Sequence, residues 1–201
     1  MFPLGTVLLP GLFLPLHVFE PRYRALVQDC LAGTPEFGVA LIERGQEVGG
    51  GDSRFGVGCV ARILEAGALP DGRYALATVG VRRIRVTEWL PEAPYPMAEV
   101  EDWPDPPIAE ADSERRDAVA SELRRVLALA AEVGEAVPSA ADVELAADVE
   151  ASSYQLAALT PVGPLDRLAL LAAPSVGERL DRIAGFLADV EAVLASRLDG
   201  G

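Results

Sequence analysis

The chain has 201 residues, half of them hydrophobic, and a formal net charge of −14. A chain of this length can bury a core without disulfides or metals, so the composition excludes disorder and predicts one globular domain with an appendage. Because binding to nucleic acid or to an anionic membrane needs a cationic patch, the acidic excess disfavours both partners. The chain has no lysine, which excludes a phosphate-binding P-loop, a Schiff-base enzyme and a Ser–Lys peptidase site.

The first half of the chain has the pattern of short strands around one early helix. Glu20-Pro21 is typical of a helix start, and Gly33 is typical of the end of that helix. A glycine-rich turn is predicted at 45–52 and a hairpin turn at 69–72. Apolar runs predict strands at 7–9, 12–17, 37–42, 55–64, 74–79, 82–89 and 97–100. About six short strands with one helix favour a small, nearly closed β-barrel.

Large side chains in this half have predicted positions. Phe13, Phe37 and Phe55 are predicted to lie in the core. Trp89 and Trp103, near strand ends, either close the barrel or stand exposed as binding anchors. Alternation along the strand at 82–89 predicts an apolar face of Val81, Ile84 and Val86 and an arginine face of Arg82, Arg83 and Arg85.

The second half of the chain has a helical pattern. Residues 104–111, rich in proline and acidic side chains, are predicted to link a β-barrel domain at 1–103 to a helical subdomain at 112–201. Apolar residues in steps of three and four predict helices at 113–134, 149–159 and 164–172, and a last helix that begins at Ser175. The apolar stripes of the first and last helices are predicted to pack on each other within one chain. The sequence therefore predicts the α+β class, a small β-barrel followed by an α-helical bundle.

The compartment is predicted from the cysteines and the apolar start of the chain. Cys30 and Cys59 lie in apolar surroundings without a framework spacing, so we expect two reduced thiols. Residues 1–16 are apolar, but Pro and Gly interrupt them and a basic start is missing, so we expect no signal peptide. No apolar run reaches the length of about eighteen residues that a membrane span needs. We expect a cytoplasmic protein.

The sequence contains no constellation that is typical of an enzyme. His17 is the one histidine, and we interpret it as a structural residue with a hydrogen-bond partner. One histidine and two distant cysteines cannot form a zinc site, and the glycines at 49–51 precede a strand where a dinucleotide site needs a helix. We therefore expect no metal, no cofactor and no enzymatic activity. A carboxylate pair that meets only in the folded chain stays open as a hydrolase alternative.

Several ordered motifs stand in the first hundred residues. Phe2-Pro3-Leu4 and a run ending in Pro10-Gly11 come first, and residues 15–23 then read P-L-H-V-F-E-P-R-Y. In this order the motifs resemble the opening of the LON N-terminal domain, the substrate-binding region of Lon proteases. Residues 56–63, 69–73 and 79–84 are similar to its later strands and hairpin, and residues 152–198 resemble the helical bundle that follows.

The resemblance implies a PUA-like β-barrel followed by helices, and a non-catalytic module that recognises polypeptides. The ATPase and Ser–Lys peptidase of a full Lon protease are not expected, because the chain is short and lacks lysine. The implied partners are unfolded or extended polypeptide segments and a protease, with the chain as an adaptor or regulator of proteolysis. A monomer and a homodimer both stay open. RNA binding, by analogy with other PUA-like barrels, is an alternative that the charge disfavours.

The segment at 19–23 supplies the candidate binding residues, which are Phe19, Glu20, Arg22 and Tyr23. Two roles are open for them. They form either an ion-paired and aromatic-packed connection between a strand and the following helix, or a direct contact with a ligand.

Overall fold

The computed structural model describes residues 1–199, and the chain divides into two compact units, Met1–Pro104 and Asp105–Gly201. The first unit holds the strands and one helix, and the second unit holds the other helices of the described residues. Strands and helices that are segregated in this way define the α+β class, so the predicted class is confirmed.

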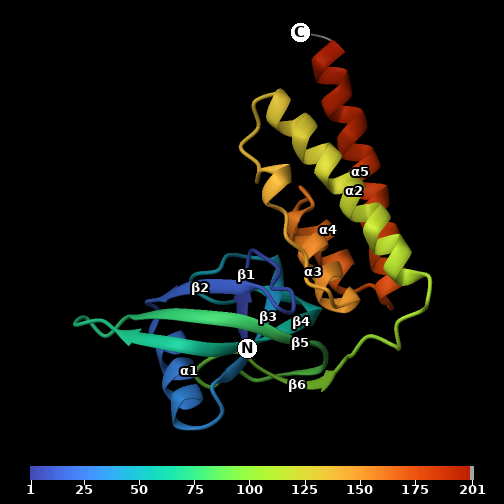
Figure 1. The fold of residues 1–201 in the computed structure, drawn as a ribbon. Coiled ribbons are helices and arrows are strands. Elements are labelled where there is room, and N and C mark those ends of the chain that lie inside the picture. The colour runs from blue at the N-terminus through green and yellow to red at the C-terminus, as the bar shows by residue number, and fades with distance from the viewer. Residues whose placement is uncertain (200–201) are drawn as a thin grey trace. The chain divides into compact units, whose positions relative to one another are not determined.

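The strands of the first unit form one mixed sheet (Figure 1). Their order across the sheet is β1-β3-β4-β5-β2, and β6 pairs with β5 off this path. β1 runs parallel to β3, whereas the other neighbours are antiparallel. The strands are β1 Phe2–Leu4, β2 Phe13–Val18, β3 Glu36–Arg44, β4 Ser53–Ala68, β5 Tyr74–Leu90 and β6 Met97–Asp102.

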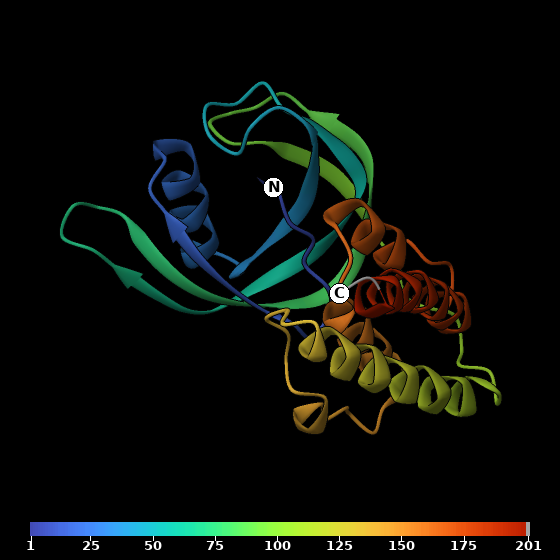
Figure 2. The same cartoon turned by 90° about the horizontal axis from the view of Figure 1, so that it is seen from above.

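The sheet curls into an open barrel (Figure 2). β1 and β2 stand at the two ends of the hydrogen-bonded path and do not pair with each other. Helix α1, Pro21–Ala32, buries Tyr23, Leu26 and Val27 in the same apolar cluster as Phe2 and Phe37 of the strands. The helix therefore supplies part of the hydrophobic core of this open barrel.

Residues 7–9, predicted as a strand, are not one. Their side chains are buried, with exposed fractions of 9%, 4% and 0%, yet the backbone pairs with no strand. The first strand lies earlier, at β1. An apolar run predicts that its residues are buried. It becomes part of a sheet only where a neighbouring strand pairs with it in register.

The strands predicted at 74–79 and 82–89 are one continuous strand, β5. Its pairing with β4 shifts near Gly80, because Val60 pairs with Arg82 while the next residue, Ala61, pairs with Gly80. The unpaired extra residue is a β-bulge, which changes the alternation that follows it. Arg83, predicted on an exposed arginine face, is 3% exposed, because its guanidinium group packs on Trp103 and donates to the carbonyl oxygen of that residue.

Both tryptophans of the first unit lie half-buried beneath arginine guanidinium groups. Cζ of Arg83 and Cζ of Arg85 stand 4.4 and 3.5 Å from the Trp103 ring centroid, and Cζ of Arg54 stands 5.1 Å from that of Trp89. Cations over aromatic faces are mutually stabilising. Neither ring is a bare exposed anchor.

The second unit is a helical bundle. Its helices are α2 Asp112–Glu132, α3 Val149–Leu159, α4 Pro164–Leu171 and α5 Val176–Asp199, with a short 3₁₀ turn at Ala140–Asp142. The predicted stripes on α2 and α5 are buried, and these two helices pack along each other (Figure 1). Ser175 caps α5, because its Oγ accepts a hydrogen bond from the N–H of Glu178 at 3.2 Å.

A buried charge cluster organises this bundle. Arg179 of α5 and Asp105 are both fully buried, and one nitrogen of Arg179 donates to both Asp105 oxygens at 3.0 and 2.7 Å. Arg179 also donates to Ser153 Oγ at 2.8 Å and to the carbonyl of Leu170 at 3.3 Å. Its guanidinium carbon stands 3.8 Å from the Tyr154 ring centroid. Asp105, placed in a linker by the sequence, is thus packed within the second unit.

Candidate functional site

The first unit has a pocket of about 200 Å³ beside the two strands that end the sheet. We name it the seam pocket, because β1 and β2 both line it and do not pair with each other. The start of α1 and the glycine-rich loop at 45–52 complete the lining. Its residues are Phe2, Leu4, Pro15, Leu16, His17, Val18, Phe19, Glu20, Tyr23, Glu47 and Val48.

The sequence of β2 explains why this strand presents side chains on both faces. Leu14, Leu16 and Val18 alternate with more exposed residues, and Val18 is 1% exposed. Pro15 lacks an N–H, which an edge strand tolerates because one side of it needs no ladder hydrogen bond. β2 pairs with β5 on one side only, so its sequence suits its place.

Two expectations for β2 are wrong. Phe13, predicted in the core, is 60% exposed, because it lies on the outward face of the strand. Of the other two predicted core phenylalanines, Phe37 is buried and Phe55 is half-buried. His17, interpreted as a hydrogen-bonded structural histidine, is exposed at the pocket, and its imidazole forms no hydrogen bond among the described residues.

Tyr23 forms part of the pocket lining and of the core. Its ring stacks on Phe2 with a centroid distance of 4.2 Å, and Cζ of Arg22 stands 4.4 Å from its centroid. Its hydroxyl is buried and has no hydrogen-bond partner within residues 1–199. Burial disfavours the charged phenolate and raises the pKa of Tyr23 to about 12.

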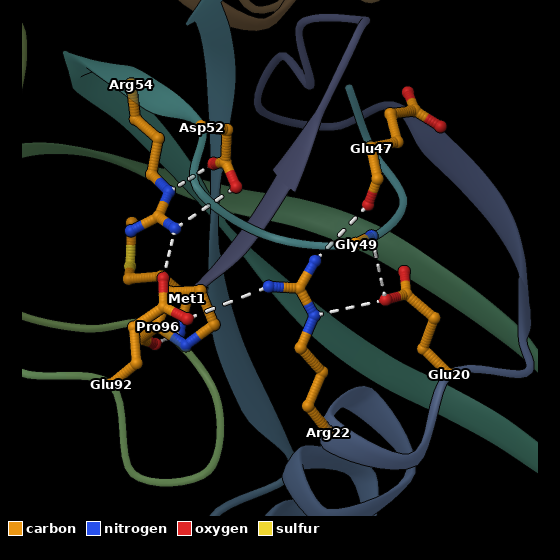
Figure 3. A network of polar contacts seen from close by, with 9 residues as sticks. All are labelled: Met1, Glu20, Arg22, Glu47, Gly49, Asp52, Arg54, Glu92 and Pro96. Carbon is orange, nitrogen blue, oxygen red and sulfur yellow. Dashed lines mark hydrogen bonds and ion pairs between the residues drawn. The ribbon is translucent and has the colours of Figure 1, made fainter. Parts of the chain in front are cut away.

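A chain of ion pairs includes Arg22, the residue before this tyrosine (Figure 3). Nε of Arg22 contacts a Glu20 oxygen at 3.2 Å, and Nη1 of Arg22 stands 3.7 Å from Glu92. Arg54 then joins Glu92 to Asp52. Burial raises the pKa of Asp52, but hydrogen bonds from Arg54 and from its own backbone, with the field of Arg54, outweigh this and leave the pKa lowered. Asp52 is therefore a paired acceptor.

The same residues hold the loop that forms one wall of the pocket (Figure 3). Nη2 of Arg22 donates to the carbonyl oxygen of Glu47 at 3.4 Å, and the N–H of Gly49 donates to Glu20 at 3.4 Å. Gly49, Gly50 and Gly51 have φ values of 101°, 80° and 77°, which side chains rarely adopt. The glycines thus allow the backbone conformation of this loop, and the hydrogen bonds to Glu20 and Arg22 hold the loop in place.

The four predicted binding residues therefore meet at one place but differ in position. Phe19, Glu20 and Tyr23 line the seam pocket, with Phe19 50% exposed at its rim, whereas Arg22 lies behind the loop wall. Sequence reasoning missed the role of Val48, because a loop has no periodicity that could indicate it. It also missed the role of β1, although the Phe2-Pro3-Leu4 motif marked this strand.

The described part of the chain holds no group of three or more side chains that could bind a metal ion. Both cysteines are free thiols, and burial raises the pKa of Cys59 to about 12, so this residue is a thiol and not a nucleophilic thiolate. None of the described helices combines the length and the apolar character that crossing a bilayer demands.

Comparisons with known proteins agree with the sequence motifs. Residues 1–189 match the family model of the ATP-dependent protease La (LON) substrate-binding domain. Lon protease 2 of Herpetosiphon aurantiacus is 28% identical over 194 residues, which cover 92% of this chain and 23% of that protein. Lon protease 2 of Myxococcus xanthus is 34% identical over 98 residues, which cover 48% of this chain and 12% of that protein. The chain thus spans about a quarter or less of these relatives.

Two solved structures have the same fold. The Lon N-terminal domain protein from Xanthomonas campestris aligns with a TM-score of 0.65 and 28% identity, covering 92% of this chain and 95% of that one. The N-terminal domain of the Mycobacterium avium complex Lon protease also aligns with a TM-score of 0.65, at 20% identity and over 93% and 97% of the two chains. With a family model that covers both units, the chain belongs to the LON substrate-binding domain family.

Proposed function

We propose that this protein is a non-catalytic module that binds unfolded or extended polypeptide segments and acts as an adaptor or regulator of a Lon-type protease. The observation that carries the proposal is the family match, which extends over residues 1–189 and so includes both the barrel and the bundle. The match supports a substrate-recognition role for a chain that has both parts.

The seam pocket supports this proposal by its chemistry. Its lining is mostly apolar, and Phe19 and Val48 at its rim are 50% and 54% exposed. Apolar side chains exposed beside an unpaired strand edge are suited to bind an extended segment of another chain. Folded proteins bury such segments, so a site of this kind distinguishes unfolded chains from folded ones.

The two alternatives lack a comparable observation. A hydrolase with paired carboxylates needs one carboxyl that can donate a proton, whereas Glu20, Asp52 and Glu92 are each paired with an arginine. An RNA-binding surface needs available cations, whereas Arg82 pairs with Glu36 at 2.6 Å and with Asp102 at 2.8 Å. The two free thiols favour a reducing compartment, which is in line with the cytoplasm.

Binding to unfolded chains is tested with one polypeptide in two states. A small disulfide-bonded protein is labelled with a fluorophore and used either native or after reduction and blocking of its thiols with an uncharged reagent. We expect fluorescence anisotropy to rise on titration with the full chain for the unfolded form and not for the native form. Equal titration curves for the two forms, or no rise with either, would contradict the proposed function.

The adaptor or regulator role is tested with a purified Lon-type protease and the same unfolded polypeptide. We expect the rate of degradation to change when the chain is added, upward for delivery and downward for competition. A short peptide that the protease cleaves without recognition serves as the control and keeps its rate. An unchanged rate for the unfolded polypeptide, at concentrations where anisotropy shows binding, would refute this role and leave the binding function standing.

A further inference from the structure

We propose that the seam pocket accepts one large apolar side chain of an extended segment, and that it prefers segments in which a neighbouring residue is basic. This inference rests on the proposed function and specifies the site and the chemical class of its ligand. It follows from the size of the pocket, from the nature of its lining and from the charges around it.

The size of the pocket suits a side chain and not a cofactor. Its volume is about 200 Å³, whereas sites for small molecules and cofactors commonly enclose about 300–1,000 Å³. Phe2, Leu4 and Val18 are buried residues in its lining, and they give it an apolar floor. Burying one aromatic or large aliphatic side chain there removes apolar surface from water, which is the main source of affinity.

The rim adds apolar contacts at the mouth. Phe19 follows β2 and Val48 lies on the glycine-rich loop, and both are about half exposed. A residue that enters between them covers their apolar surface as well as its own. An aromatic side chain that a ligand covers and removes from water can lose a large share of the binding energy when it is truncated.

The charge of the pocket is one-sided. Glu20 and Glu47 line it, and no arginine does. The neighbouring ion-paired network contains three carboxylates and two guanidinium groups, and the carboxylate of Glu47, which accepts a hydrogen bond from the N–H of Gly5, brings the formal charge to −2. The local excess has the same sign as the net charge of −14 for the whole chain. A basic residue beside the inserted side chain is therefore attracted, and an acidic one is repelled.

Glu47 is the better placed of the two lining carboxylates to contact a ligand. Glu20 is committed to Arg22 and to the N–H of Gly49, and its side chain is only 15% exposed. Glu47 is exposed and lies on the loop wall, where one of its oxygens accepts a hydrogen bond from the N–H of Gly5. A neutral glutamine at position 47 keeps an oxygen acceptor for Gly5 but removes the charge.

The test uses three short fluorescent peptides that differ at two adjacent positions, Phe-Lys, Ala-Lys and Phe-Glu. They are titrated with the full chain and with three variants, Phe19→Ala, Glu47→Gln and Phe13→Ala. Phe13 is the matched control, because it is 60% exposed on the same edge strand but does not line the pocket. Circular dichroism and thermal unfolding verify that each variant is folded.

We expect the unmodified chain to bind the Phe-Lys peptide most tightly, with both other peptides weakened. Phe19→Ala should weaken the Phe-Lys peptide by about tenfold, the effect of a rim aromatic residue, and Phe13→Ala should leave it unchanged. Glu47→Gln should reduce the preference for Lys over Glu and keep the preference for Phe over Ala. The Lys preference should also shrink as salt is added.

Each contrary result has its own meaning. Equal losses for Phe13→Ala and Phe19→Ala would overturn the assignment to the pocket. Equal binding of the Phe-Lys and Phe-Glu peptides would overturn the preference for a basic neighbour. Binding of an unfolded polypeptide without any preference among the three peptides would refute this inference and leave the proposed function intact. Failure to bind the unfolded polypeptide as well would refute the function itself.

Discussion

Replacing Arg179 by methionine is the most informative stability test of the helical unit. This arginine is fully buried and has hydrogen bonds to Asp105, Ser153, Tyr154 and the carbonyl of Leu170. Methionine has a similar length and no charge, so it fills much of the volume and leaves the carboxylate of Asp105 buried without its cation.

The expected cost follows from that stranded charge. Removing one partner of a buried ion pair typically destabilises a protein by about 3–5 kcal/mol, because the desolvated charge that stays behind is uncompensated. In a unit of this size, each kcal/mol lowers the melting temperature by about 4–8 °C. Arg179→Met should therefore lower it by about 12 °C or more. Adding Asp105→Leu removes the stranded charge and should restore most of the loss.

Thermal and urea unfolding, followed by circular dichroism, measure this effect in the full chain. Arg125→Met is the matched control, because Arg125 also pairs with a carboxylate, Glu191, at 2.8 Å, but on the exposed surface. We expect little change from it, since water screens an exposed pair. If Arg179→Met unfolds at the same temperature as the unmodified chain, or if the double variant is less stable than the single one, the reasoning on the stranded charge is wrong.

Three further predictions concern the first unit. Because the pKa of Tyr23 is about 12 in the folded state and about 10 in an unfolded chain, its contribution to stability is complete below pH 10 and is lost between about pH 10 and 12. Tyr23→Phe should reduce the alkaline loss of stability, which pH-dependent urea unfolding measures, and an unchanged alkaline profile would contradict this. Gly58→Ala should destabilise by about 1–3 kcal/mol, because its methyl group would overlap the carbonyl oxygen of Val39 on the neighbouring strand. Gly56→Ala, on the same strand with its nearest atom 4.0 Å away, should change little, and equal effects would refute the steric explanation. Hydrogen bonds from arginines lower the pKa of Glu36, so its stabilising effect is present above the ordinary carboxylate pKa and is lost as pH falls through the lower folded value. Glu36→Gln should flatten the acid limb of the stability profile, and an identical limb would count against the pairing.

The helices of the second unit could be predicted because their apolar stripes were unambiguous. Val119, Leu123 and Val126 on α2, and Leu180 and Ile183 on α5, follow helical spacing, and all of them are buried. The buried pair of Arg179 and Asp105 could not be predicted. A charged residue on an apolar stripe is common at its margin, and no sequence pattern links it to an aspartate that is 74 positions away.

The strands were predicted less completely, since a strand is defined by its partner. The run at 12–17 contains almost only apolar residues, so alternation could not tell the inward Leu16 from the outward Phe13. Arg83 was expected to be exposed, but it is buried against Trp103, whose carbonyl oxygen accepts from its Nε at 3.1 Å. Both errors come from non-local pairing, which local patterns do not contain.

Only part of the site could be predicted, again because local sequence patterns do not contain non-local contacts. The residues of the 19–23 segment are adjacent in sequence and were proposed together, but their partners Glu47, Gly49 and Glu92 come from two loops. Loops have no periodic pattern, so a sequence cannot place them. The fold shows the first of the two roles left open, and contact with a ligand stays a prediction. Glu20 and Arg22 hold a wall, while Phe19 stands at the mouth of the pocket.

These two roles suggest how an open barrel can expose a small apolar binding site without exposing much of its core. A gap between two unpaired strands exposes apolar core to water, which is a risk of aggregation as well as an opportunity for binding. Here the start of α1 fills most of the gap with Tyr23, and the loop held by Arg22 covers part of the rest. What stays open is a pocket of side-chain size with carboxylates at its edge. Carboxylates at that edge attract a basic segment, which is the preference proposed above.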